Sequence, residues 1–129
     1  MSQPSPLSIF CNQLIRFFEE LSDTFPEERD IKIAIDAIQS ARKANPRLVL
    51  DMFVIHVVND MREHIMNEDI NGFLGVANKK IQNQFNEIMP AITIFQKHWP
   101  TLTEDNRAII WKYMKVLVTL SDKAQSVRF

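Results

Sequence analysis

The sequence predicts an all-α protein, a compact single-domain bundle of five or six helices, and three observations support this. Apolar residues recur at intervals of three and four along most of the chain, which is the spacing of one helix face. Only two glycines occur among 129 residues, too few for a turn-rich β-sandwich. The prolines interrupt or precede the periodic runs, as they do at helix ends. A chain of this length is large enough for one core.

The first helix is expected to follow a flexible leader, residues 1–7, because this polar stretch contains Pro4 and Pro6. Ser8 is a suitable capping residue for the helix. The helix must end before Pro26, since the residue that precedes a proline is disfavoured in the α conformation. Its apolar face is formed by Phe10, Leu14, Phe17, Phe18 and Leu21.

The second helix is predicted to start at once, with Pro26 in its first turn. Glu27, Glu28 and Asp30 would then lie near the positive end of its dipole. Its apolar stripe consists of Ile31, Ala34, Ile35, Ile38 and Ala41.

The third helix is predicted to begin with Asn45 as its cap and Pro46 at its first position. Its apolar run, residues 48–58, is about half the length that a bilayer requires, so it is expected to lie in a protein core. We therefore expect a central helix that is buried on most sides. The residues expected to supply its buried contacts are Leu48, Met52, Phe53, Val57 and Met61.

The second half of the chain is predicted to contain a helix from Asn67, a short segment from Ala91 to Trp99, and a last helix capped by Thr103. Pro90 should end or kink the first of these, and Pro100 should force a turn. Their apolar stripes consist of Ile70, Phe73, Leu74, Ala77, Ile81, Phe85 and Ile88, and of Ile109, Ile110, Tyr113, Met114, Leu117 and Leu120. The helical domain is expected to span residues 8–124, with 125–129 as a frayed tail.

Charge and cysteine content indicate which partners to expect. Fifteen basic and sixteen acidic residues give a formal net charge of -1, so nothing indicates a large surface for nucleic acid or an anionic membrane. A protein partner is therefore expected. Cys11 is the single cysteine, which excludes an intrachain disulfide and favours a reducing, intracellular location.

The candidate residues for chemistry are few. His56, Asp60 and His64 are spaced by four and share a helix face, but the two histidines would lie about 12 Å apart and no third ligand is identified. We expect histidines at the core edge with a local carboxylate partner, and no metal. Cys11 beside Asn12 could suggest a nucleophile, but such a thiol needs a histidine base and an oxyanion site, and the sequence places neither near it. No catalytic or cofactor-binding residue is predicted, and the protein is not expected to be an enzyme.

Two further patterns have competing interpretations. Gly72 and Gly75 have the spacing of a GxxG nucleic-acid loop, but apolar residues lie between them, so close helix packing is the better explanation. Phe95 and Trp99 are four apart and would share a face of the short segment between two prolines. They are the candidate protein contact, although filling the core is the favoured alternative for Trp99.

Two stretches carry a resemblance to a known family. They are "LIRFFEELSDTFPEERDIKIAIDAIQSARKANPRLVLDMF" and "IQNQFNEIMPAITIFQKHWPTLTEDNRAIIWKYMKVL". Both resemble a family of short uncharacterised proteins encoded by large DNA viruses of algae and protists, the nucleocytoplasmic large DNA viruses. The similarity covers residues 14–124, and the aromatic-proline pairs at Phe25 and Trp99 are its most specific parts.

The resemblance implies a viral protein made in an infected cell, either in the host cytoplasm or packaged in the virion, and it transfers no catalytic or binding residue. We expect a non-enzymatic helical protein that acts through contacts with a viral protein, a host protein or a second copy of itself. The alternative is an accessory nucleic-acid-binding subunit of viral replication or transcription machinery. That alternative would use Arg42, Lys43 and Arg47, or Lys79 and Lys80.

Overall fold

The structure is a computed structural model that describes residues 5–83 and 96–126, with the side chains of 5–79 and 96–126. Within these ranges every regular element is helical, and the predicted all-α bundle with five or six helices is confirmed. The α-helices are α1 (Pro6–Thr24), α2 (Arg29–Ala44), α3 (Pro46–Phe53), α4 (Asn59–Met66), α5 (Ile70–Asn83) and α7 (Glu104–Ser126). A π-helical segment, η1 (Val54–Val58), joins α3 to α4, and a 3-10 turn, η2 (Trp99–Thr101), precedes α7.

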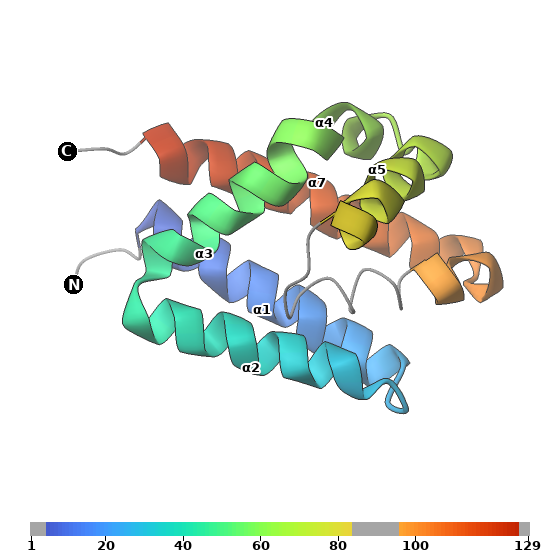
Figure 1. Ribbon diagram of the computed structural model, residues 1–129, viewed down its shortest axis with the longest axis horizontal. Helices are drawn as coiled ribbons and strands as arrows, with labels where there is room; N and C mark the ends of the chain where they lie inside the picture. The colour runs from blue at the N-terminus through green and yellow to red at the C-terminus, as the bar shows by residue number, and fades with distance from the viewer. Residues whose placement is uncertain (1–4, 84–95, 127–129) are drawn as a thin grey trace.

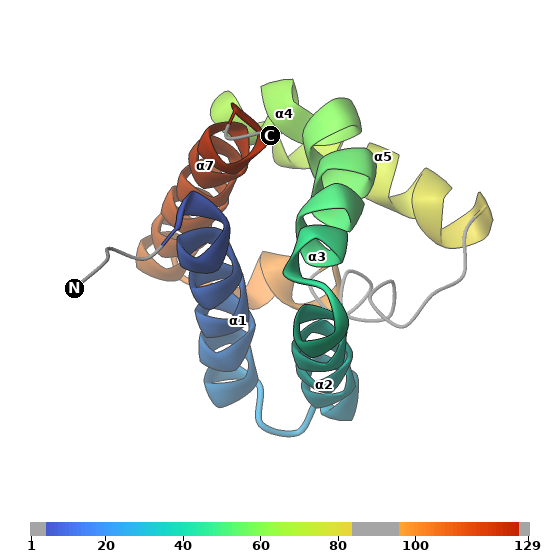
Figure 2. The same ribbon diagram turned by 90° about the vertical axis from the view of Figure 1, so that its left-hand side faces the viewer.

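The helices form two layers (Figure 1, Figure 2). Helices α1 and α7 run antiparallel side by side in one layer, while α2 and the α3–η1–α4 rod form the other. Helix α1 contacts α7, α2 and α3, and α4 contacts both α5 and α7. The start of α1 and the end of α7 therefore lie at one end of the bundle, and the α1–α2 turn and η2 lie at the other (Figure 1).

Helix α1 begins three residues earlier than the predicted cap at Ser8 implies. Ser5 is its N-cap, because the Ser5 hydroxyl oxygen accepts the Ser8 backbone N–H at 3.1 Å. The prediction that Ser8 is the cap was wrong, since Pro6 occupies the first turn, where no backbone N–H is needed. The C-terminal prediction is confirmed, because α1 ends at Thr24, just before Phe25 and Pro26.

Helix α2 begins later than predicted. Pro26 and Glu27 form a turn that is closed by a hydrogen bond from the Glu28 N–H to the Phe25 carbonyl, at 3.0 Å. Glu28 is the N-cap, and Asp30 is the only one of the three predicted acids inside the first turn. The placement of Pro26 within the helix was therefore wrong. Burial of Phe25 holds the chain in this turn before the helix can start.

The α3–η1–α4 rod confirms some predictions and corrects others. Asn45 caps α3, with its Oδ1 accepting the Arg47 N–H at 3.1 Å, and Pro46 lies in the first turn as expected. The expectation of burial on most sides was wrong, because one face of the rod is open to solvent, where Leu48 and Ile55 are exposed. Met61 is buried, whereas Met52, Phe53 and Val57 are half-buried. The buried residues of the rod are Val49, Leu50, Val58, Met61 and Ile65.

The corner between α4 and α5 is a Schellman motif, with Glu68 in the left-handed conformation at φ 52°. The Glu68 N–H bonds to the Ile65 carbonyl, and the Asp69 N–H bonds to the His64 carbonyl at 2.8 Å. Asn67 therefore ends α4, and its assignment as the start of the next helix was wrong. Asp69 caps α5 instead, because its Oδ1 accepts the Gly72 N–H at 3.0 Å.

Helix α7 begins as predicted. The Thr103 hydroxyl oxygen accepts the Asn106 N–H at 3.2 Å, and Glu104 and Asp105 lie in the first turn. Its predicted stripe needs one correction, because Ile109 is 51% exposed. The helix continues to Ser126, two residues beyond the expected domain end at Ala124. The predictions for residues 1–4, 84–95 and 127–129, including the effect of Pro90, lie outside the described residues.

The core lies between the two layers. Fully buried side chains from α1, from the α3–η1–α4 rod and from α7 meet there. Edge-to-face aromatic contacts link the elements, among them Phe10 with Phe53 at 5.0 Å and Trp99 with Trp111 at 5.4 Å. Aromatic pairs in this geometry add specificity to the packing beyond the area that they bury.

Candidate functional site

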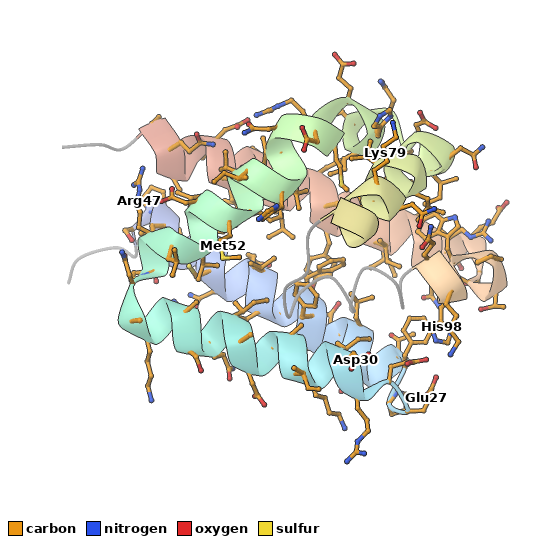
Figure 3. The ribbon with its side chains drawn as sticks, viewed as in Figure 1. Glu27, Asp30, Arg47, Met52, Lys79 and His98 are labelled. Atoms are coloured by element: carbon orange, nitrogen blue, oxygen red, sulfur yellow. The ribbon has the colours of Figure 1, made fainter. Side chains whose placement is uncertain are left out.

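The two aromatic-proline turns meet at one end of the bundle, although they are far apart in sequence. The Phe25 ring stacks on the His98 ring with centroids 4.2 Å apart and an interplanar angle of 18°. Leu102, which follows the Trp99–Pro100 turn, packs against Phe25 and Ile31. Polar and charged side chains lie around this stack, and together with Phe25 we name them the corner cluster. Glu27 and His98 of this cluster are labelled in Figure 3. Its members are Phe25, Glu27, Glu28, Lys97 and His98.

Glu28 is the centre of the corner cluster. Its Oε1 accepts hydrogen bonds from His98 Nε2 at 2.8 Å and from Lys97 Nζ at 3.1 Å. The Glu28 and His98 side chains are only 16% and 17% exposed, whereas Lys97 is 68% exposed. The hydrogen bond from His98, followed by that from Lys97, lowers the pKa of the Glu28 carboxyl. Glu28 is therefore an ionised acceptor at neutral pH.

Three side chains of the corner cluster converge as potential metal ligands. One carboxylate oxygen each from Glu27 and Glu28 and one ring nitrogen of His98 all lie within 4.8 Å of one another. Glu28 is the N-cap of α2, but its side chain makes no capping hydrogen bond to that helix. The carboxylate is turned toward His98 instead.

A groove between α1 and α7 adjoins the corner cluster and shares Phe25 with it. The cavity has a volume of about 50 Å³. Tyr113 lines it beside Glu20, and burial is the main cause that raises the pKa of this phenol, so it stays protonated. We name this feature the α1–α7 groove. Its lining residues are Phe17, Glu20, Leu21, Thr24, Phe25, Leu102, Asn106, Ile109, Ile110 and Tyr113.

This end of the bundle is acidic. Residues 19–30, which run from the second half of α1 into α2, contain six acidic residues and one basic residue. The chain as a whole is almost balanced, with sixteen acidic and fifteen basic residues. The acidic segment therefore favours positively charged partners at this end.

Of the two predicted contact residues, Trp99 is the one that the structure describes. Trp99 is 6% exposed and packs edge-to-face on Trp111, so the core alternative describes it. Arg107 covers the other side, with its guanidinium carbon 5.4 Å from the Trp99 ring centroid and its Nη2 donating to the Trp99 carbonyl at 2.9 Å. Phe95 lies outside the described residues. Trp99 therefore cannot contact a partner protein unless the core around it is disrupted.

The row of His56, Asp60 and His64 does not come together as a site. His64 Nδ1 lies 3.1 Å from Asp69 Oδ2, so its carboxylate partner is the cap of the next helix. The Gly72 N–H, and then His64, lower the pKa of the Asp69 carboxyl. The Nδ1 of His56 is buried and has no hydrogen-bond partner within the described residues. His64 therefore has the local carboxylate partner that was expected, whereas the Nδ1 of His56 has none among the described residues.

The two glycines also differ from each other. A Cβ on Gly72 would overlap the His64 ring and the Asp69 carboxylate, which confirms the predicted close approach between helices α4 and α5 at this position. A Cβ on Gly75 would meet nothing within 4 Å, so close packing was the wrong explanation there.

Cys11 and the basic residues are used within the fold or lie apart. Cys11 is buried, and this burial raises the pKa of its thiol, which disfavours the nucleophilic thiolate. Arg42 Nη2 donates to the Ser8 hydroxyl at 3.3 Å. Arg47 and Lys79 lie on separate parts of the surface (Figure 3), and the Lys80 side chain is not among those described.

No family model matches the chain, and no curated protein or solved structure is significantly similar to it. The helices of the described ranges include none that is both long enough and apolar enough to cross a membrane.

Sequence reasoning missed the corner cluster. Glu28 and His98 are 70 residues apart, and neither a metal-ligand motif nor helical spacing connects them. The available signal was the repeated pattern of an aromatic residue followed by proline at Phe25 and Trp99, with chemistry-bearing residues on either side. The repetition shows two similar turns, but contact between them depends on tertiary packing.

Proposed function

We propose that the protein is a non-enzymatic helical protein that acts through protein–protein contacts, and that the α1–α7 groove is its contact site. The observation that carries the proposal is an apolar, partly aromatic groove with the exposed Ile109 side chain beside it, on an acidic end of the bundle. The partner is a protein segment that presents one apolar anchor residue flanked by Lys or Arg.

The size of the groove supports a single side-chain anchor. A volume of about 50 Å³ is enough for the end of one aliphatic side chain, and too small for a cofactor. Full burial of such a side chain supplies about 1.5–3 kcal/mol, which is less than a micromolar complex requires. Contacts between the acidic residues of this end and basic residues of the partner would add specificity and faster association more than affinity.

A non-enzymatic role is supported by the protonated, buried thiol of Cys11 and by the structural hydrogen bond of His64. Cys11 is buried with a raised pKa, and His64 is paired with a helix cap. The resemblance to proteins of large DNA viruses supports a viral setting, in which the protein is an adaptor in the cytoplasm of the infected cell or a component of the virion.

The alternative role, contact with nucleic acid, has less support. Arg42 is hydrogen-bonded to Ser8, and Arg47 lies far from Lys79 (Figure 3), so the two candidate basic groups are separate and each contains only two or three cations. Binding of labelled single-stranded or duplex DNA that weakens steeply with salt would favour this alternative over the proposed one.

The proposal is tested by selecting peptides from a displayed random library on the full-length protein. We expect the selected peptides to share one large apolar residue flanked by Lys or Arg. Ile109→Lys should abolish their binding, because it removes the apolar surface and adds a charge that repels a basic peptide. Ile55→Lys is the matched control, since Ile55 is 55% exposed and Ile109 is 51% exposed, but Ile55 lies on the α3–η1–α4 rod.

The result can be read in both directions. Equal loss of binding in the two variants would indicate non-specific adhesion and would overturn the site. Selected peptides that are acidic, or that bind Ile109→Lys as well as the parent, would also contradict it. Binding of the selected peptides should weaken as ionic strength rises, because the flanking charges are exposed.

A further inference from the structure

We propose that Glu27, Glu28 and His98 of the corner cluster bind one divalent transition-metal ion, for which zinc is the best match. This inference does not depend on the proposed partner contact. Its three ligands do not line the α1–α7 groove, and its test measures metal binding directly.

The donor set suits zinc better than calcium or magnesium. Zinc binds histidine nitrogen and carboxylate oxygen at about 2.0–2.2 Å, whereas calcium and magnesium take oxygen ligands. In a tetrahedral site, donors at these distances are about 3.4 Å apart. His98 Nε2 and Glu28 Oε1 are 2.8 Å apart, and the three donor atoms lie within 4.8 Å of one another. Only a small rearrangement is needed to surround one ion.

Two of the three ligands are already held in position. The His98 ring is stacked on the buried Phe25 ring, which directs Nε2 toward Glu28. Glu28 is fixed at the N-cap of α2, and its carboxylate is not used as a cap. Glu27 is exposed in the preceding turn, so it is free to move toward the ion. Such preorganisation reduces the loss of conformational freedom on binding.

The charges also match a divalent ion. Two carboxylates and a neutral imidazole would neutralise the two positive charges of zinc. Lys97 donates a hydrogen bond to the same Glu28 oxygen as His98, so its ammonium group would compete with a metal ion for this oxygen. Its side chain is 68% exposed and can move into solvent when the ion binds. Removal of Lys97 should therefore strengthen metal binding.

A bound ion would join the α1–α2 turn to the segment that leads into η2. Because the ligands come together only in the folded chain, the ion would bind the native state and raise its melting temperature. The metal would thus act as a clamp on the end of the bundle.

The test uses the full-length protein after treatment with a chelator. Zinc is added in a calorimetric titration and in a thermal melt, and cobalt is used as a spectroscopic substitute. We expect one bound ion per chain and a higher melting temperature. His98→Gln, Glu28→Gln and Glu27→Gln should each weaken binding at least about tenfold, since loss of a supporting partner alone typically has that effect. Lys97→Met should tighten binding.

The His64→Gln variant is the matched control. His64 and Asp69 form a similar nitrogen-to-oxygen contact at 3.1 Å, but only two donors are involved. This variant should keep the full response to zinc. The proposal is overturned if the parent shows no binding, if His98→Gln keeps the response, or if Lys97→Met weakens it. Should a ligand variant fail to fold, Lys97→Met with cobalt still decides the question, because its side chain lies mainly in solvent.

Discussion

Arg62 and Asp122 form a two-point ion pair that ties α4 to α7. Arg62 Nη1 lies 2.9 Å from Asp122 Oδ2, and Nη2 lies 2.6 Å from Oδ1. Both side chains are partly exposed, at 43% and 45%. The pair therefore fixes the position of the rod over α7 more than it stabilises the fold, since water screens it.

The first prediction concerns the strength of this pair. Asp122→Asn should lower the free energy of unfolding by about 0.2–1 kcal/mol at neutral pH, the range for exposed pairs. Urea denaturation of the parent and the variant measures this difference. Arg62→Met with Asp122→Asn provides the double-mutant cycle that isolates the coupling between the two side chains.

The same pair predicts a dependence on pH. The hydrogen bond from Arg62 lowers the pKa of the Asp122 carboxyl in the folded state. The contribution of the ion pair to the free energy of unfolding is therefore complete above the unfolded pKa of about 3.9. This contribution is lost as the pH falls through the lower pKa of the folded state. The stability difference between the parent and Asp122→Asn should shrink below pH of about 4. A difference that grows in acid would contradict this assignment.

The second prediction concerns Trp99. Because its side chain is buried against Trp111, Trp99→Ala should lose about 3–5 kcal/mol of stability. Trp99→Phe keeps a ring against Trp111 and should lose less. Chemical denaturation followed by circular dichroism measures both variants. A loss below about 1 kcal/mol for Trp99→Ala would mean that the side chain contributes little to the core.

The third prediction compares the two glycines of α5. Gly75→Ala should stabilise the protein by about 0.5–1 kcal/mol, because the added methyl group meets open space within a helix. Gly72→Ala should be destabilising, because the methyl group would displace His64 and Asp69 from their contact. Thermal melts of the two variants give the comparison. The loss in Gly72→Ala should be smaller in a His64→Ala background, and equal effects at both positions would refute the explanation.

The fourth prediction concerns the left-handed residue at the α4–α5 corner. Glu68→Gly and Glu68→Ala both remove the ion pair with Lys115, whose Nζ lies 2.6 Å from Glu68 Oε2. The alanine variant must then place a residue with a Cβ atom at the positive φ of position 68, whereas glycine has no Cβ atom there. Glu68→Gly should therefore be more stable than Glu68→Ala by about 1 kcal/mol in denaturant titration. Alanine equal to glycine would indicate that the corner relaxes to another conformation.

The predictions that succeeded from sequence depend on local chemistry. Asn45 before Pro46, and Thr103 before two acids, specify helix starts through side chains only two or three residues away. Ser8 and Asn67 have the same capping chemistry but were misassigned, because a neighbouring residue supplied the cap in each case. Several polar residues close together leave the boundary uncertain by a few positions.

The predictions that failed depend on tertiary packing. Apolar periodicity alone cannot distinguish the exposed Ile55 and Ile109 from buried isoleucines, because the pattern does not show which face has a neighbour. The meeting of Glu28 with His98 is fixed by the packing of Phe25 and Leu102, across a long separation in sequence. The fold class was therefore predictable, and the candidate site was not.

The π-helical segment η1 determines which residues of the rod face the core. The Asn59 N–H bonds to the Val54 carbonyl five residues earlier, so this turn holds one residue more than an α-helical turn. If the same residues formed a regular α-helix without the wider π turn, α4 would be rotated by about 100° relative to α3. The side chains of Met61 and Ile65 would then point away from the core, while Val49 and Leu50 would still face it. The extra residue thus sets the rotational phase between the two halves of one continuous helix.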